Sequence, residues 1–151
     1  MGNQPTCPDC SAFLSDNLTC QDHFHTLLFW ENEVPVYGEV HHLTVLCYHL
    51  QHPSLYSLEG LQYARKLLVD FLAGGLSPAE VRRQEKAQLD SGKRQIKITS
   101  RPGSSGAYPT PIHWRMTVAD VVAAGKEHYP AAVRAWADSI LHSLAELPPP
   151  E

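Results

Sequence analysis

The chain has 151 residues, of which 43% are apolar and 19% charged, so it is long enough to bury the core of one globular domain. No apolar run approaches the roughly 18 residues of a membrane-spanning helix, which argues against a membrane protein. The first residues have neither the basic region nor the apolar region of a secretory signal, and a cytoplasmic protein is expected. In that compartment four cysteines are more typical of thiols or metal ligands than of disulfides.

The net charge of −4 is distributed unevenly along the chain. The first 64 residues contain seven acidic residues, six of the nine histidines and all four cysteines, but no Lys or Arg. Such a front half, without permanent cations, suits the binding of a metal cation. Basic residues gather instead between positions 82 and 101, as they do in nucleic-acid-binding modules, although the pI of about 6.1 argues against that function.

Start and stop signals predict a series of helices. T-C-Q-D at 19–22 and S-P-A-E at 77–80 each pair a capping residue with an acidic residue three positions later. Pro and Gly residues interrupt or end the helical patterns, as in N-E-V-P-V-Y-G at 32–38. In chain order, the predicted helices cover about 19–31, 39–51, 58–73, 77–89, 117–125 and 130–147.

The pattern changes in the second half of the chain. R-Q-I-K-I-T-S at 94–100 alternates apolar and polar residues, which predicts a half-buried strand or a short hairpin. The Gly- and Pro-rich segment 101–114 is a long loop, and its length is typical of a functional segment or of a cover over a pocket. The predicted fold is therefore mainly α, a small single-domain helical bundle (1–151) with a metal-binding loop (1–20), a helical core (21–89), a strand and long loop (90–116) and C-terminal helices (117–147).

The strongest chemical pattern is a set of cysteines near the N-terminus. Cys7 and Cys10 form a C-x-x-C, and Cys20 and His23 follow as C-x-x-H after nine residues. This spacing is a Cys₃His zinc pattern, and Cys20 and His23 would lie one turn apart at a helix N-terminus, which favours thiolate. A redox C-x-x-C and unligated thiols are the alternatives, but no predicted strand precedes Cys7 as in redox motifs. We therefore predict a zinc site with the ligands Cys7, Cys10, Cys20 and His23.

H-H-L-T-V-L-C-Y-H-L-Q-H-P at 41–53 holds four of the nine histidines. On a helix with about 100° per residue, all four lie within an arc of about 100°, and Cys47 falls on a separate apolar face where a small buried residue is expected. At a rise of about 1.5 Å per residue, His42 and His49 are about 10 Å apart along the axis, too far for one ion. The helix can therefore supply one or two metal ligands in place of His23, or its histidines are structural; the candidates are His41, His42, His49 and His52.

Three segments carry a resemblance to a known family. C-P-x-C near the start, C-x₃-F-x₂-L-L-x₂-E in the first predicted helix, and V-H-x-L-T-V-x-x-Y-x-x-Q-H-P at 40–53 resemble a bacterial family of uncharacterised small proteins, a domain of unknown function. The resemblance extends through S-P-A-E to M-T-V-A-D-V and covers most of the chain. It implies no activity, but it favours the residues that match the family's string, His41, Gln51 and His52, over His23 and His49, which do not.

Three functions remain open from the sequence, and whether the protein is an enzyme is one of the open questions. The first is a zinc protein whose metal site is mainly structural and which acts as an interaction or regulatory module. The second is a metal-dependent hydrolase or transferase whose base comes from a nearby His or Glu, although the sequence has no H-E-x-x-H, G-x-S-x-G or P-loop motif. The third is a nucleic-acid-binding module.

Overall fold

A computed structural model of the whole chain describes residues 6–14, 17–74, 77, 79–80, 83, 108 and 112–146. It confirms that the protein is mainly α-helical. The α-helices in these residues are α1 (Cys20–Glu33), α2 (His41–Gln51), α3 (Leu58–Leu72), α5 (Val118–Ala124) and α6 (Tyr129–Ala145). The short 3-10 helices η1 (Pro35–Val40), η2 (Pro53–Leu55) and η3 (Lys126–His128) lie between them. None of the helices in the described residues combines the length and apolar character needed to cross a bilayer.

Side-chain caps fix where the helices begin. The N–H of Asp22 donates to Oγ1 of Thr19 at 3.1 Å, and the N–H of Thr19 donates to Oδ2 of Asp22 at 2.8 Å. Thr117 and Asp120 repeat the second of these bonds at 2.8 Å before α5, and the Ser57 hydroxyl accepts a backbone hydrogen bond at the start of α3. Each cap satisfies N–H groups that the first helical turn leaves without partners. The helix starts predicted at these three positions are confirmed.

Two boundaries differ from the predicted ones. The second helix was expected from position 39, but α2 begins at His41, because η1 starts at Pro35 and continues the chain as a tighter helix up to that point. The last helix begins at Tyr129, one residue before Pro130. Proline is tolerated in the first turn of a helix, where its missing N–H would have no partner.

Part of the prediction falls on residues that the structure does not describe. The predicted strand at 94–100 and most of the predicted helix at 77–89 lie outside the described residues. At the start of that helix, the N–H of Glu80 donates to the Ser77 hydroxyl at 3.2 Å. Where the chain is described, it contains no strand; Thr6 and Phe13 form an isolated antiparallel bridge.

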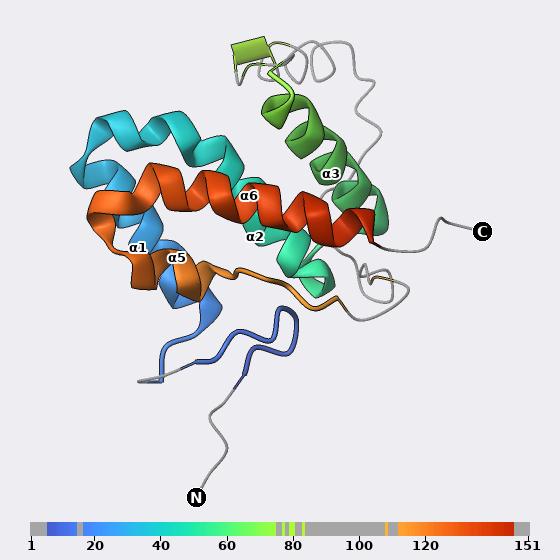
Figure 1. Cartoon of the computed structure of the whole chain (residues 1–151), viewed down its shortest axis with the longest axis horizontal. Coiled ribbons are helices and arrows are strands. Elements are labelled where there is room, and N and C mark those ends of the chain that lie inside the picture. Colours follow the sequence, from blue (N-terminus) through green and yellow to red (C-terminus); the bar gives the residue numbers. More distant parts are fainter. Residues whose placement is uncertain are drawn as a thin grey trace, which may run out of the picture.

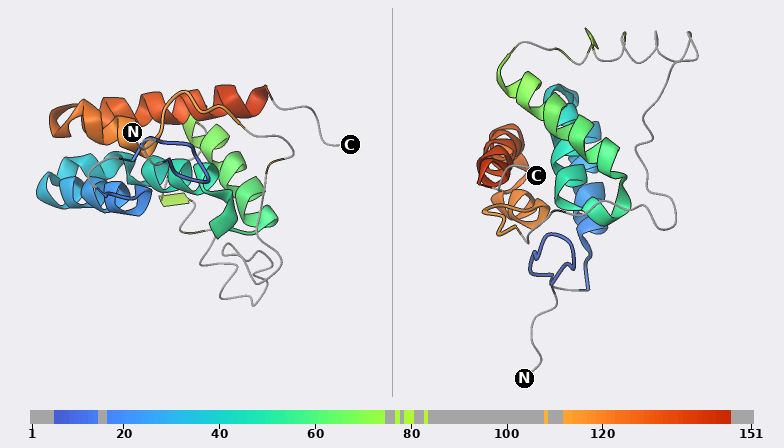
Figure 2. Two further views of the ribbon diagram at one scale, coloured as in Figure 1. Left: turned by 90° about the horizontal axis from the view of Figure 1, so that it is seen from below. Right: turned by 90° about the vertical axis from the view of Figure 1, so that its right-hand side faces the viewer.

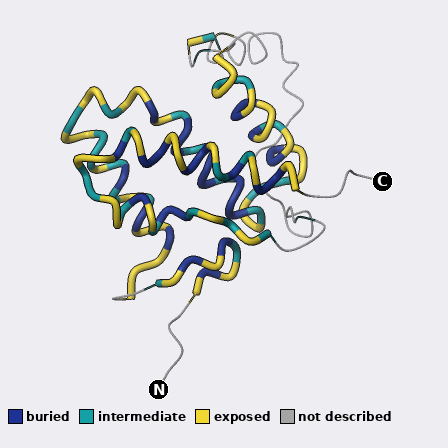
Figure 3. The backbone as a smooth tube through the Cα atoms, viewed as in Figure 1, coloured by how far each residue is buried: buried dark blue, intermediate teal, exposed yellow. Residues whose placement is uncertain are grey.

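The helices pack in two layers (Figures 1 and 2). Helix α6 lies across α2 and forms one layer with α5, while α1 and α2 form the other and α3 packs against α2 and α6. Buried positions follow the inner sides of these helices (Figure 3). The largest side chains of the core are fully buried: Trp136, Tyr129, Leu27, Leu50 and Leu68. The N-terminal loop, blue in Figure 1, lies below α5 and beside the end of α2, which is where the site described next is built.

Candidate metal centre

Three cysteines and one histidine converge where the N-terminal loop meets the helices. The donor atoms of Cys7, Cys10, Cys20 and His52 all lie within 4.8 Å of one another. The Sγ atoms of Cys10 and Cys20 are 3.6 Å apart. All four residues are buried, with exposed fractions between 2% and 7%. Because thiolate sulfur and imidazole nitrogen are strong ligands for transition metals, this cluster can hold a metal ion.

A tight turn places Cys7 and Cys10 on the same side of the loop. The N–H of Ser11 donates to the carbonyl of Cys7 at 2.9 Å, and the N–H of Cys7 donates to the carbonyl of Ala12 at 2.9 Å. Ser11 adopts a φ of +64°, in the left-handed region, which lets the chain reverse direction directly after Cys10. The turn therefore holds two thiols toward one centre without support from a helix or strand.

Helix α1 supplies the third thiol. Cys20 is the first residue of α1, directly after the Thr19 cap, and is 4% exposed. The unpaired N–H groups and the dipole at a helix N-terminus favour a negative charge there. The cap that begins α1 therefore also places Cys20 where a thiolate is stabilised.

The fourth donor, His52, follows the last residue of α2. Its Nδ1 lies 2.8 Å from the carbonyl of Tyr48, so Nδ1 carries the proton and donates it, which leaves the lone pair on Nε2. The Tyr48 ring stacks on the imidazole with centroids 4.1 Å apart and fixes its orientation. Nε2 is fully buried and, among the residues that the structure describes, has no hydrogen-bond partner. Since buried polar atoms nearly always have a partner, this nitrogen beside three thiols fits a metal ligand.

The thiols also perturb one another's ionisation. Hydrogen bonds from the Cys10 and Cys20 thiols hold the pKa of Cys7 far below its ordinary range. Hydrogen bonds with the Cys10 thiol and then with the Cys7 thiol raise the pKa of Cys20 far above its ordinary range, and burial adds to the increase. The cluster therefore accepts one negative charge readily and opposes further ones. A divalent cation would supply the compensating charge that lets all three sulfurs ionise.

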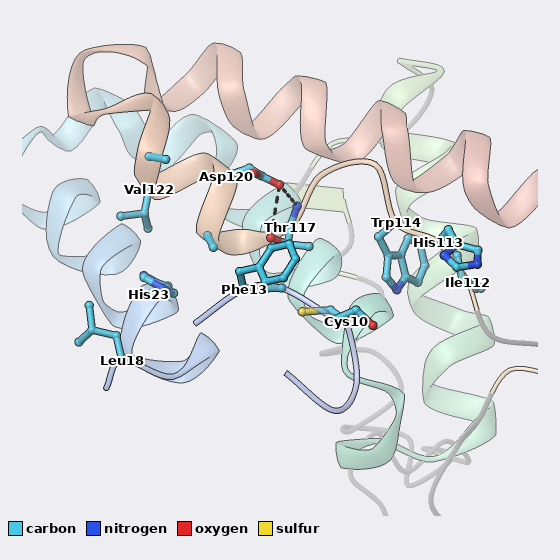
Figure 4. A pocket seen from close by; sticks show the side chains of 14 residues that line it. Cys10, Phe13, Leu18, His23, Ile112, His113, Trp114, Thr117, Asp120 and Val122 are labelled. Atoms are coloured by element: carbon cyan, nitrogen blue, oxygen red, sulfur yellow. Dashed lines mark hydrogen bonds between the residues drawn. The ribbon is translucent and has the colours of Figure 1, made fainter. Parts of the chain in front are cut away.

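His23 does not lie among these donors. It is on α1, 8% exposed, and lines a cleft of about 630 Å³ next to Cys10 (Figure 4). The cleft lies between the N-terminal loop, α1 and α5, and the described residues 112–114 form part of its wall. Residues 112–114 belong to the segment 101–114, whose length is typical of a functional loop or of a cover over a pocket.

The other histidines of α2 contact neighbouring side chains. Nδ1 of His41 lies 2.6 Å from Oε1 of Glu31, and the second carboxylate oxygen of Glu31 accepts a hydrogen bond from the Tyr129 hydroxyl. The His42 ring meets Phe71 edge to face, with centroids 4.4 Å apart. These contacts tie α2 to α1, α3 and α6 and bring neither His41 nor His42 to the cysteines.

His49 packs on the Tyr56 ring with centroids 4.0 Å apart. Burial lowers the pKa of His49 to about 4, so the ring is neutral at physiological pH. Cys47 lies fully buried in the core, on the apolar face of α2. The structure therefore separates the four histidines into one residue beside the thiols and three that contact other side chains: His41 with Glu31, His42 with Phe71 and His49 with Tyr56.

The contact between Tyr48 and His52 is the part of the site that sequence reasoning missed. Tyr48 orients the imidazole through both its carbonyl and its ring. The signal was available, because residues four apart on a helix lie on the same face. The hydrogen bond from Nδ1 of His52 to the Tyr48 carbonyl fixes which ring nitrogen faces the thiols. His52 makes this bond from a non-helical backbone conformation directly after α2, which the helical pattern alone does not predict.

Comparison with known proteins gives one family. Residues 5–145 match the family model described as "Family of unknown function (DUF5946)". No curated protein and no solved structure matches the chain. The match covers nearly the whole sequence, from the loop that carries the cysteines to the end of α6. The chain therefore belongs to DUF5946, a family of unknown function.

Proposed function

We propose that this protein binds one zinc ion through Cys7, Cys10, Cys20 and His52, and that the ion has a structural role. The observation that carries this proposal is the buried, unpaired Nε2 of His52 within reach of three thiols. With zinc–sulfur bonds of about 2.3 Å, tetrahedral geometry separates two sulfur ligands by about 3.8 Å. The 3.6 Å between the Cys10 and Cys20 sulfurs is close to that separation.

The chemistry of the donors supports zinc. Magnesium and calcium prefer oxygen ligands, whereas thiolate and imidazole select softer ions, and a set of three cysteines and one histidine is typical of structural zinc sites. The four cysteines are free thiols, so the three in the cluster are available as thiolate ligands.

The number of donors supports a structural role over a hydrolase or transferase. A catalytic zinc keeps one coordination position for water or substrate, and four protein donors fill a tetrahedral shell. The ion would hold the loop that carries Cys7 and Cys10 onto the first residue of α1 and the end of α2. Beside it, Phe13 is 67% exposed and Leu18 42% exposed, and exposed apolar side chains of this kind are typical of interaction surfaces. We therefore propose that the protein is an interaction or regulatory module.

Elemental analysis of the purified protein and its variants tests the ligand set. We expect about one zinc per chain in the wild type. Cys10→Ser and His52→Ala should lose the ion to a moderate chelator at concentrations that leave the wild type loaded. His23→Ala and His49→Ala are the matched controls and should retain it, because neither ring lies among the donors. A wild type without metal, or loss in His23→Ala with retention in His52→Ala, contradicts the proposed set.

Thermal unfolding tests the structural role. An ion present at about 1,000 times its dissociation constant stabilises the folded state by about 4 kcal/mol. For a chain of this size, that corresponds to a decrease in Tm of roughly 10 °C when the ion is removed by a strong chelator. Cys10→Ser should show the lower Tm without chelator. A loaded wild type whose Tm does not respond to chelation rules out a structural ion.

A further inference from the structure

The cleft beside the metal centre has unused hydrogen-bonding capacity. His23 is 8% exposed and lines the cleft, and within the described residues its ring has no hydrogen-bond partner. A neutral imidazole offers one lone pair as an acceptor. Asp120 also lines the cleft, and its Oδ2 caps α5, while no hydrogen bond in the described part of the chain uses its Oδ1. Two acceptors therefore face the same space.

The walls around these acceptors are apolar and partly aromatic. Phe13 comes from the N-terminal loop, Leu18 precedes α1 and Val122 comes from α5, whereas Trp114, from the segment before α5, lies at the opposite end of the cleft from Leu18 and His23 (Figure 4). The exposed fractions of Phe13 and Leu18, 67% and 42%, are large for apolar side chains that lie beside a cleft. The volume of about 630 Å³ falls in the range of small-molecule sites. A ligand in the cleft would bury apolar surface that the protein alone leaves in water.

The charges indicate which ligands fit. Among the described residues that line the cleft, none is Lys or Arg, and Asp120 contributes a carboxylate. The first 64 residues, which supply the loop and α1, carry seven acids and no permanent cation. An anion would find no counter-charge here, whereas an ammonium group offers only donors to the two free acceptors. Aromatic faces such as those of Phe13 and Trp114 also attract cations.

We propose that this cleft is a binding site for a small molecule with an apolar, aromatic body and a primary amine, with the amine held by Asp120 and His23 and the body by Phe13, Leu18 and Val122. The proposal rests on the proposed metal-held loop, because Cys10 and Phe13 belong to the same turn. A ligand would then connect the loop, α1 and α5 in one contact. The proposal therefore names aromatic amines as the class of ligand that the proposed interaction module would bind.

The experiment is an NMR titration of the isotope-labelled full chain with its native metal. Phenethylamine is the probe, phenethyl alcohol its neutral analogue and phenylacetate its anionic analogue. We expect phenethylamine to shift the signals of Leu18, His23 and Val122, with a dissociation constant of about 1 mM. The alcohol should bind about tenfold more weakly, and phenylacetate should cause no saturable shift. The indole N–H of Trp136, which is buried and bonded to Gln51, is an internal control that should not move.

Variants test where the probe binds. Asp120→Asn keeps an oxygen to cap α5 but removes the charge, and should weaken phenethylamine binding about tenfold. His23→Phe keeps a ring of similar size and should weaken binding about threefold to tenfold. Ala123→Trp adds a large side chain from an exposed position of the cleft wall and should abolish binding. Asp138→Asn, on the exposed side of α6, should bind phenethylamine as the wild type does.

Several results would overturn the proposal. These are no saturable shift with phenethylamine, equal binding of all three probes, or binding that survives Ala123→Trp. The metal content of the same samples is measured alongside. A chain that holds its zinc and binds no amine would refute the ligand site alone, and a chain without metal would refute the proposed metal centre.

Discussion

The histidines at 41, 42, 49 and 52 show how position on one helix decides the role of a side chain. His52 follows α2, and its backbone angles, with φ −126° and ψ 60°, turn its ring toward the N-terminal loop. The other three project from the helix itself and meet Glu31, Phe71 and Tyr56. One residue type therefore serves as a candidate ligand at the helix end and as a packing or ion-pairing group along the helix.

His42 should make the stability of the protein depend on pH. Burial, aided by the charges of His41 and Arg134, lowers the pKa of His42 below its ordinary value. The unfolded chain, whose histidines have a pKa of about 6.5, therefore binds a proton more readily than the folded one, and stability falls as the pH decreases from about 6.5 toward the lowered folded pKa. His42→Phe keeps a ring against Phe71 but does not titrate. Urea unfolding of the metal-loaded proteins at pH 7.5 and 5.5 should show a smaller loss of stability in the variant.

The control is the range from pH 7.5 to 8.5, where His42 is neutral in both the folded and the unfolded state. There the unfolding free energies of the wild type and of His42→Phe should change in parallel. Parallel change down to pH 5.5 would contradict the lowered pKa of His42.

At the scale of single residues, the spacing of the cysteines predicted that they would come together, but it did not identify the histidine that joins them as the fourth donor. The C-x-x-C and the cysteine after nine residues are local features, and the structure places Cys7, Cys10 and Cys20 together. His23 fitted the same local spacing, whereas His52 is 32 positions beyond Cys20 in the sequence. Which histidine approaches the thiols depends on how α2 packs against α1, and periodicity along one helix carries no information on that packing.

Gln51 connects three elements through its side-chain amide. It is fully buried; its Nε2 donates to the carbonyl of Met116 at 2.6 Å, and its Oε1 accepts from Nε1 of Trp136 at 3.1 Å. These bonds join the end of α2 to α6 and to the segment that precedes α5. A buried amide whose two ends are both hydrogen-bonded favours one alignment of the two helical layers, in addition to holding them together.

Replacement of Gln51 by Leu should be strongly destabilising. The substitution keeps a similar volume but leaves the Trp136 N–H and the Met116 carbonyl without partners in the core. At about 1–3 kcal/mol for each of the two unpaired groups, the free energy of unfolding should fall by about 2–6 kcal/mol in urea unfolding experiments. Gln62→Leu, on the exposed side of α3, is the matched control and should change it by less than about 0.5 kcal/mol. A Gln51→Leu variant as stable as the wild type would show that the two Gln51 hydrogen bonds make no net contribution to the free energy of unfolding.

The helices themselves were the most predictable part of the fold. Thr19 with Asp22, Ser57, and Thr117 with Asp120 mark helix starts through local hydrogen bonds, so a short window of sequence contains the whole signal. The layer arrangement was not predictable in the same way. It depends on contacts such as that between Gln51 and Trp136, which join residues 85 positions apart.

At the scale of the whole molecule, the helical core and the metal-binding loop rest on different interactions. The core has apolar side chains from α1, α2, α3, α5 and α6 in one continuous cluster. The loop enters that cluster through Cys7, Cys10 and Ala12. If the cysteines bind an ion, the loop depends on it far more than the helices do.

Hydrogen exchange should therefore show a local response to metal removal. After chelation, the amides of Cys7 and Ser11, which close the turn, should exchange at least about tenfold faster than in the loaded protein. Amides in the middle of α6, near Trp136 and Ile140, should remain protected, because their hydrogen bonds lie within the helix and side chains from five helices cover them. Cys10→Ser should show the same pattern without chelator. Unchanged exchange in the loop, or equal loss of protection in loop and α6, would contradict this division.

The position of the cluster in the sequence has a consequence for how the protein is made. The proposed ligands all lie between residues 7 and 52, and α3, α5 and α6 follow them. Because ribosomal synthesis releases the N-terminal part first, the three thiols and then His52 leave the ribosome before the second layer of helices exists. On the proposed ligand set, all four ligands are therefore available to an ion before α6 has left the ribosome. Shortage of the metal in a cell should then reduce the yield of newly synthesised protein more than the activity of molecules already folded.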